Sequence, residues 1–441
     1  MNKKLGMAVA GAVMAFGATA ANAGITIPAG DWTIDIGGNV NAYYTNTRYD
    51  GVLDNDLEGA PGSDDSNTIS TGLLPAALGI GGKTRQNDLD IAFQFTFFTG
   101  VDSTDGNGSA NVFGANGAGG NSLNIRQAFM TFGDASWGSI KMGRDLGLFG
   151  SDAILSDMTL LGVGTGAGGN GNSTLGRIGS GYLYADWVGQ IQYSSPNWNG
   201  FSFAVAARQP WGNSDNNDLG FDGKASYEWA GDVAGKVWVG FLSQKTQTAA
   251  VDAVEGYCVR NIETDFRNEV TQTGLFGADA GTCGTGGWTQ ISGNAAVDAV
   301  SERASAWEIG GKVSMGGLGL VAYYYDGKGM GAPVVASANL PISGLQINSA
   351  DLDVDGGYVQ ATYVLPFGTK LGASWGRSQI EANGGGSDFE NESWIVGAYH
   401  PLTKSLNLVA EYTDTDYENI GLEADQDGGA KTLALGAILF F

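Results

Sequence analysis

Few residues of this chain have the types and spacing that chemistry requires. Its one histidine, His400, stands directly before Pro401, so neither a catalytic triad nor a histidine-rich metal site can be assembled. Asp222 and Glu228 have the residue type of a glycosidase carboxylate pair, although neighbouring carboxylates in an acidic chain are more often simply hydrated. We therefore expect no enzyme activity, no catalytic residue, no bound metal and no cofactor.

The composition excludes one class of partner and favours one class of fold. The 441 residues include 46 acidic and 22 basic side chains, and the net charge is −24. Phosphate binding needs a basic surface, so nucleic acid is not an expected partner. The chain has 73 Gly, only 9 Pro, and 11 Trp, 16 Tyr and 19 Phe, which fits a β-barrel better than two or three soluble domains.

The first 23 residues have the pattern of a secretory signal peptide. Lys3 and Lys4 precede an apolar run from Leu5 to Gly17, and Ala21-Asn22-Ala23 forms a small-residue cleavage site. We expect cleavage after Ala23, which leaves a mature chain of residues 24–441 with 46 acidic and 20 basic residues, a net charge of −26. No later stretch approaches the roughly 20 consecutive apolar residues of a transmembrane helix, so a membrane-spanning part would have to consist of strands.

Two cysteines in an exported chain suggest one disulfide. A bond between Cys258 and Cys283 would close a loop inside the long polar stretch at 247–303. Two unpaired thiols are the alternative.

Apolar and polar residues alternate along many segments, as required of a wall between lipid and water. In residues 32–44 the even positions include Trp32, Ile34 and Val40, while the odd positions include Thr33 and Asn39. Similar segments recur along the chain, and their count is about sixteen. An even number of strands is typical of bacterial outer-membrane barrels.

The connections between these segments are alternately short and long. Tight turns are predicted at 134–137, 196–200, 230–233, 316–317, 366–369 and 401–404, and long polar connections at 49–68, 100–122, 147–186, 247–303, 327–353 and 417–430. Short turns on one rim and long loops on the other are typical of an outer-membrane barrel, with the turns in the periplasm and the loops outside the cell. Because lipid offers no partner to a free backbone group, the sheet must close. The sequence therefore predicts an all-β fold, a closed antiparallel transmembrane barrel.

The end of the chain carries the most specific signal. One face of the last strand bears Leu433, Leu435, Ala437, Leu439 and the terminal Phe441. It resembles the closing strand of Gram-negative outer-membrane porins, and the resemblance implies that Phe441 is the signal read by the barrel-assembly machinery. With the leader, the strand count and Met142-Gly143-Arg144 before a long third loop, the mature chain resembles the trimeric sixteen-stranded porins, which implies a homotrimer in the outer membrane.

In that family the third loop folds inward and narrows the pore. The resemblance makes residues 147–186 the candidate constriction loop, with an acidic side formed by Asp145, Asp152 and Asp157. For the opposite wall, alternation nominates six inward basic residues: Arg126, Lys141, Arg208, Lys224, Lys236 and Lys312. Opposed charges across a narrow lumen order the permeating ions. The alternative is that each lysine merely hydrates the lumen.

These features predict an outer-membrane channel for passive diffusion of small hydrophilic solutes and ions. The acidity of the mature chain predicts a mild cation preference, unless the constriction is locally basic. A porin selective for sugars or organic acids is the nearest alternative, with Trp238, Tyr323, Tyr325 and Tyr358 as a surface on which a sugar slides. A secreted calcium-binding β-helix and a barrel enzyme are more distant alternatives.

Overall fold

The computed structural model describes residues 24–51, 65–101, 123–165, 173–211, 218–248, 257–260, 288–291, 300–330, 352–382, 388–418 and 427–441. Eighteen strand segments form one sheet, and β12 (Tyr257–Arg260) and β13 (Trp288–Ile291) form a separate hairpin. The segments of the main sheet are β1 (Ile25–Ala29), β2 (Trp32–Gly51), β3 (Asp65–Ser70), β4 (Ala76–Gln86), β5 (Leu89–Thr99), β6 (Asn124–Asp134), β7 (Gly138–Leu146), β8 (Trp187–Ser194), β9 (Phe201–Arg208), β10 (Gly220–Trp229), β11 (Val233–Thr248), β14 (Val300–Met315), β15 (Leu318–Lys328), β16 (Leu352–Val364), β17 (Lys370–Ala382), β18 (Phe389–Pro401), β19 (Leu406–Glu418) and β20 (Gly428–Phe440).

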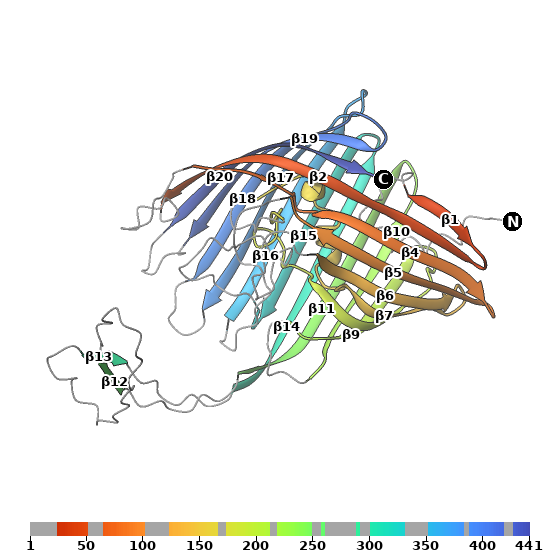
Figure 1. Ribbon diagram of the computed structural model, residues 1–441, viewed down its shortest axis with the longest axis horizontal. Coiled ribbons are helices and arrows are strands. Elements are labelled where there is room, and N and C mark those ends of the chain that lie inside the picture. The colour runs from red at the N-terminus through yellow and green to blue at the C-terminus, as the bar shows by residue number, and fades with distance from the viewer. Residues whose placement is uncertain are drawn as a thin grey trace, which may run out of the picture.

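The sheet closes on itself as an antiparallel barrel (Figure 1). Strand β2 pairs with β20 along one edge and with β3 and β4 along the other. β1 and β20 pair with different lengths of the same edge of β2, and β3 and β4 pair with different lengths of its other edge. Each of these two pairs of segments therefore fills one strand position, and the 18 segments occupy 16 positions around the barrel. The expected sixteen-stranded barrel is confirmed.

The two faces of the wall follow the predicted alternation. In β2, Val40, Ala42 and Tyr44 are exposed on the outer face, whereas Asn39 and Asn41 are buried inside. Every second residue of a strand faces the same side, so the apolar set lies outside, where a lipid environment suits it. The barrel therefore has an oily exterior and a polar interior.

Short turns join consecutive strands at one end of the barrel. The connections at 135–137, 195–200, 230–232, 316–317, 365–369 and 402–405 lie at the six predicted turns. Two more short turns, which the sequence did not indicate, are Gly30-Asp31 between β1 and β2 and Asn87-Asp88 between β4 and β5. At Asn87 and Asp88, φ is 48° and 63°. Two consecutive residues of positive φ form the tight hairpin turn that matches strand twist.

The connection from β7 to β8 contains two short helical segments. These are α1 (Ser151–Ile154) and the 3-10 helix η3 (Met158–Leu161). Within the part of the chain that the structure describes, no helix has the length and apolarity needed to cross a membrane.

Several predictions concern residues outside the described set. They are the signal peptide at 1–23 with its cleavage after Ala23, most of the stretch at 247–303, and Cys283. The disulfide between Cys258 and Cys283 therefore stays a prediction.

Candidate functional site

The segment at 147–186 lies against inward-facing side chains of the barrel wall. Three wall carboxylates accept hydrogen bonds from its backbone amides. Asp222 Oδ2 accepts from Leu148 (3.0 Å) and Phe149 (3.4 Å), Glu308 Oε2 from Gly150 (2.8 Å), and Glu411 Oε2 from Val163 (2.7 Å) and Gly164 (2.8 Å). Buried backbone amides need such acceptors. Strands β10, β14 and β19 thus hold the segment at widely separated points.

Neutral side chains of the wall bind the same segment between those points. Gln360 accepts from the Met158 amide (2.7 Å) and donates to the Ser156 carbonyl (3.0 Å). The Tyr358 hydroxyl donates to Ala153 O (2.8 Å), and the Tyr43 hydroxyl to Leu161 O (2.7 Å). Buried backbone groups need such partners, so the wall satisfies a segment that has little secondary structure of its own.

Apolar packing covers the aromatic residues that had been assigned to a sugar-binding surface. Trp238, Tyr323, Tyr325 and Tyr358 all face the interior and are at most 5% exposed. They belong to one buried cluster that includes Phe149, Ile154, Met158, Tyr182 and Leu183 of the segment at 147–186. Because the segment covers their faces, a sugar has no exposed aromatic surface to slide on there.

Gly162 is required where the segment meets Glu411. A Cβ atom at this position would lie 2.1 Å from Glu411 Oε1, which is far inside van der Waals contact. The Glu411 Oε1 atom also accepts from the Tyr399 hydroxyl at 2.5 Å. Close backbone approach is a frequent reason for glycine, and here it lets one carboxylate reach two adjacent amides.

Asp152 forms the central ion pair of the site. Its Oδ2 lies 2.7 Å from Lys224 Nζ and its Oδ1 lies 2.6 Å from Lys236 Nζ, with the two lysine side chains 20% and 14% exposed. Burial by itself raises the pKa of the Asp152 carboxyl, but the charges of both lysines outweigh this and hold the pKa below its ordinary value. Asp152 is therefore ionised at neutral pH and neutralises one of two lysine charges.

The other two predicted acidic residues, Asp145 and Asp157, also bind neighbouring residues. Asp145 contacts Lys141 Nζ, four residues earlier on β7, and accepts from Gln127 (2.8 Å). Asp157 accepts from the Thr159 amide (2.9 Å) and from the Tyr182 hydroxyl (2.7 Å). Burial, together with the nearby Asp157 charge, raises the pKa of Tyr182, so its hydroxyl remains a donor.

The structure places Arg126 and Arg208 differently from the expected pore wall. Arg126 is 6% exposed and lies 4.9 Å from the Phe98 ring centroid, next to a register shift between β5 and β6. Arg208 is 1% exposed, lies 3.4 Å from Asp222 Oδ2 and covers the Trp211 ring. Both guanidinium groups are enclosed by aromatic rings and polar partners, so they belong to the packing around the segment at 147–186.

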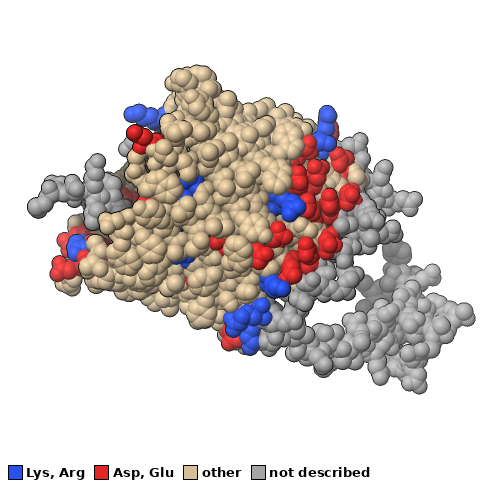
Figure 2. Space-filling view, turned by 180° about the vertical axis from the view of Figure 1, so that it is seen from behind, with Lys and Arg blue, Asp and Glu red and all other residues tan. Residues whose placement is uncertain are grey.

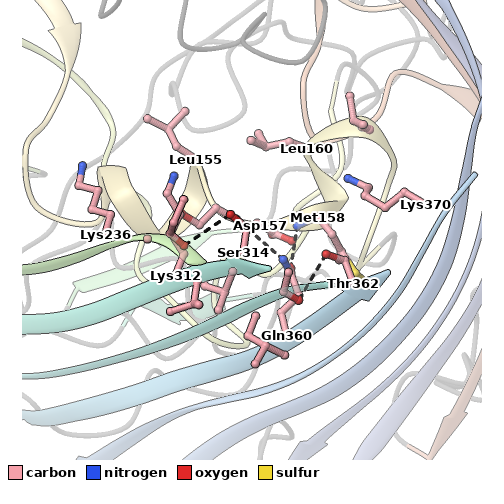
Figure 3. A pocket seen from close by; sticks show the side chains of 18 of the residues that line it. Leu155, Asp157, Met158, Leu160, Lys236, Lys312, Ser314, Gln360, Thr362 and Lys370 are labelled. Carbon is pink, nitrogen blue, oxygen red and sulfur yellow. Dashed lines mark hydrogen bonds between the residues drawn. The ribbon is translucent and has the colours of Figure 1, made fainter. Parts of the chain in front are cut away.

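A cavity of about 540 Å³ lies between this segment and the wall on the short-turn side. It is lined by Lys236, Lys312 and Lys370, with Asp157 and Glu228 as its acidic residues. In Figure 3 the amino groups of Lys236 and Lys312 lie on one side and Lys370 on the other. Sequence reasoning did not select Lys370, although it alternates with the outward-facing Leu371, and alternation is the signal that selected Lys312.

A second cavity, of about 330 Å³, adjoins the first. Both are lined by Leu155, Glu228 and Lys236, and the second adds Lys141, Asp145, Asp152 and Lys224. Together the two cavities are lined by five lysines and four carboxylates. Four of the six predicted basic residues, namely Lys141, Lys224, Lys236 and Lys312, and all three predicted acids are thus in one place.

Residues with possible catalytic roles are not assembled into a catalytic centre in the described part of the chain. Asp222 is 1% exposed and bound to Arg208 and loop amides, whereas Glu228 pairs with Lys236 at 3.4 Å. Residues 372–376 match Gly-x-Ser-x-Gly, which the sequence analysis overlooked, but Ser374 lies within strand β17 and accepts from Arg177 Nε (2.5 Å). A nucleophile elbow requires a strand-to-helix turn, which this position lacks. His400 contacts Thr369 Oγ1 at 2.8 Å, next to a short turn.

The terminal Phe441 lies at the closing seam. Its amide donates to the Gly38 carbonyl (3.1 Å) and its carbonyl accepts from the Gly38 amide (2.9 Å). The last residue therefore extends the pairing that joins the two ends of the sheet.

The whole barrel is similar to solved outer-membrane proteins. OmpF of Salmonella typhi, in complex with daunomycin, has a TM-score of 0.56 at 18% identity, covering 95% of this chain and 100% of that one. The outer membrane channel DcaP of Acinetobacter baumannii has 0.54 at 13%, covering 94% and 99%. The loop L8 deletion mutant of Vibrio cholerae OmpT has 0.53 at 16%, covering 93% and 100%. Identities this low show a shared fold alone.

Comparison at the sequence level gives the family. No curated protein sequence matches the chain significantly. A family model described as Gram-negative porin matches residues 8–420. The chain belongs to the Gram-negative porins and is an outer-membrane channel.

Proposed function

We propose that the channel is a passive diffusion pore for small hydrophilic solutes with a mild preference for anions. The segment at 147–186 is its constriction loop, and the charges that select ions are those beside the two cavities. Solutes cross by diffusion, with no chemical step and no cofactor.

The observation that carries the anion preference is the charge balance of the cavity lining. Five lysines face four carboxylates there. Asp152 and Asp145 pair with lysines, whereas Asp157 accepts hydrogen bonds from the neutral Thr159 amide and Tyr182 hydroxyl and keeps its charge, so the lining carries one surplus positive charge. Among the ion pairs of the described residues, none includes Lys312 or Lys370. A lumen with surplus positive charge attracts anions.

The net charge of the chain favours cations only if its acidic residues face the lumen. Many face outward instead, at the long-connection ends of β15, β16, β18 and β19. Figure 2 shows acidic residues gathered at one end of the barrel, and the outward-facing members include Asp326, Asp353, Asp355, Glu390, Glu392, Asp414, Asp416 and Glu418. Charges outside the wall act weakly on a permeating ion because salt screens them within about 10 Å.

The mature assembly belongs to the same proposal. We infer cleavage after Ala23, insertion by the barrel-assembly machinery through Phe441, and a homotrimer, all supported by the resemblance of this chain to trimeric porins. Migration of the unheated protein on a gel as a species three times the mass of the heated one supports the trimer. A single-barrel species in mild detergent contradicts it.

The ion preference is tested by the reversal potential across a KCl gradient in a planar bilayer. We expect a potential with the sign of chloride permeation. A potential with the sign of potassium permeation would refute the anion preference.

A further inference from the structure

We propose that the larger cavity is a binding subsite for small dicarboxylates, with Lys312 holding one carboxylate and Lys370 the other. This inference rests on the proposed anion-preferring channel and names the class of solute that it retains.

The first basis is the unneutralised charge of Lys312. Lys236 on β11 and Lys312 on β14 are direct cross-strand partners, and both line the cavity. Like charges placed opposite each other on one face of a sheet repel. Asp152 and Glu228 lie 2.6 Å and 3.4 Å from Lys236, so that lysine is compensated. Lys312, which is exposed, takes part in none of the ion pairs among the described residues.

The second basis is Lys370 on the other side of the cavity. Its Nζ lies 4.6 Å from the centroid of the Tyr399 ring. A ring face attracts an ammonium group without removing its charge, so the contact orients Lys370 and leaves its N–H groups able to bind an anion. In the described residues its charge, too, has no carboxylate within ion-pair distance.

The carboxylates that line this cavity, Asp157 and Glu228, are one fewer than its three lysines, so one positive charge is left without a counter-charge. The Asp157 carboxylate accepts hydrogen bonds from the Thr159 amide and the Tyr182 hydroxyl, on both of its oxygens. Glu228 lies 3.4 Å from Lys236. A solute that brings its own carboxylates therefore removes the unfavourable surplus of positive charge.

The shape of the cavity selects among anions. Lys312 on β14 is in register with Ser374 on β17, three strand spacings or roughly 14 Å away. Lys370 lies four residues further along β17, so the backbones of the two lysines are roughly 19 Å apart. Both side chains reach into the cavity, so their amino groups are closer than that. In Figure 3 Leu160 lies between them, and Leu155 lies on the side of Lys312. Two carboxylates joined by a short hydrocarbon match this arrangement, whereas a monocarboxylate reaches one lysine and a sulfate ion is too compact to reach both.

The test is block of the KCl current through the purified full-length channel by succinate, acetate or sulfate. We expect succinate to halve the current at a concentration at least tenfold below that of acetate or sulfate. Lys312→Gln and Lys370→Gln should each raise the half-blocking concentration of succinate about fivefold, which equals ~1 kcal/mol, the Coulomb energy of one pair at 4 Å in water. Lys328→Gln is the matched control, because Lys328 is on the outer face and pairs with Asp353.

The outcomes separate this inference from the proposed function. Equal block by the three anions overturns the subsite, as does an unchanged half-blocking concentration of succinate in both Lys312→Gln and Lys370→Gln. In either case a reversal potential with the sign of chloride permeation still supports the anion-preferring channel. A potassium-type reversal potential in KCl alone refutes the anion preference itself. Each lysine variant tests its own end of the site, so one folded variant is sufficient.

Discussion

Substitution of Asp152 by asparagine removes the carboxylate that neutralises the two lysines beside the constriction loop. Asn keeps the size of the side chain but not its charge, so Lys224 and Lys236 lose the partner that lies 2.7 Å and 2.6 Å away. The lumen gains one unit of positive charge. The ratio of anion to cation permeability should therefore rise.

The size of the change follows from Coulomb's law. For an ion that passes about 7 Å from the lost charge in a water-like medium, the energy changes by about 0.6 kcal/mol. Screening over a Debye length of about 10 Å at 0.1 M salt roughly halves this. Because anion and cation shift in opposite directions, the permeability ratio should rise roughly threefold.

The assay is the reversal potential of wild type and Asp152→Asn across the same KCl gradient. Asp416→Asn is the control, because it makes the same change of charge on the exposed outer face of β19, and it should leave the ratio unchanged. An unchanged ratio in Asp152→Asn, or an equal shift in the control, would refute the assignment of selectivity to the loop charge.

Three further predictions concern pH, loop packing and closure. The Asp152 pKa is held below its ordinary value of about 3.9, so this carboxyl stays ionised until the pH falls through the lowered value. The difference in reversal potential between wild type and Asp152→Asn should therefore persist at pH 4.5. Loss of that difference at pH 4.5 would contradict the pairing of Asp152 with the two lysines. Gly162→Ala places a Cβ 2.1 Å from Glu411 Oε1 and should break the two amide bonds to Glu411, each worth about 1 kcal/mol. We expect altered and noisier single-channel conductance, and a wild-type trace would count against this anchor. Removal of Phe441 deletes two backbone hydrogen bonds to Gly38 and should lower the fraction of heat-modifiable folded protein in refolding assays, whereas an unchanged yield would show that the seam does not need this residue.

The sequence predicted the barrel because period-two alternation is a local property. In β2 and β5 each residue's face can be read from its neighbours, and the structure confirms that pattern. In strand β4, Gly79, Gly81 and Gly82 interrupt the alternation. A Cβ at Gly79 or Gly81 would lie 2.9 Å or 2.5 Å from the amide group of Gln94 on β5, so the neighbouring strand favours glycine at these two positions.

The site was less predictable because its contacts join distant parts of the chain. The bond from the Val163 amide to Glu411 spans 248 residues, and periodicity does not tell which inward carboxylate meets the loop. Asp222, Glu308 and Glu411 were therefore missed as loop anchors. Arg126 illustrates a second limit, since it faces inward as alternation predicts, yet inward-facing residues and the end of the segment at 147–186 bury it. Simple alternation placed it in the pore wall, but it is packed against Phe98.

Passive diffusion requires that the barrel encloses a continuous water-filled path past the loop. Single-channel recording of the purified protein in a planar bilayer, over a series of KCl concentrations, tests this most directly. We predict discrete conductance steps that increase in proportion to the bulk conductivity at high salt. The absence of steps in bilayers that contain folded, heat-modifiable protein would contradict an open lumen.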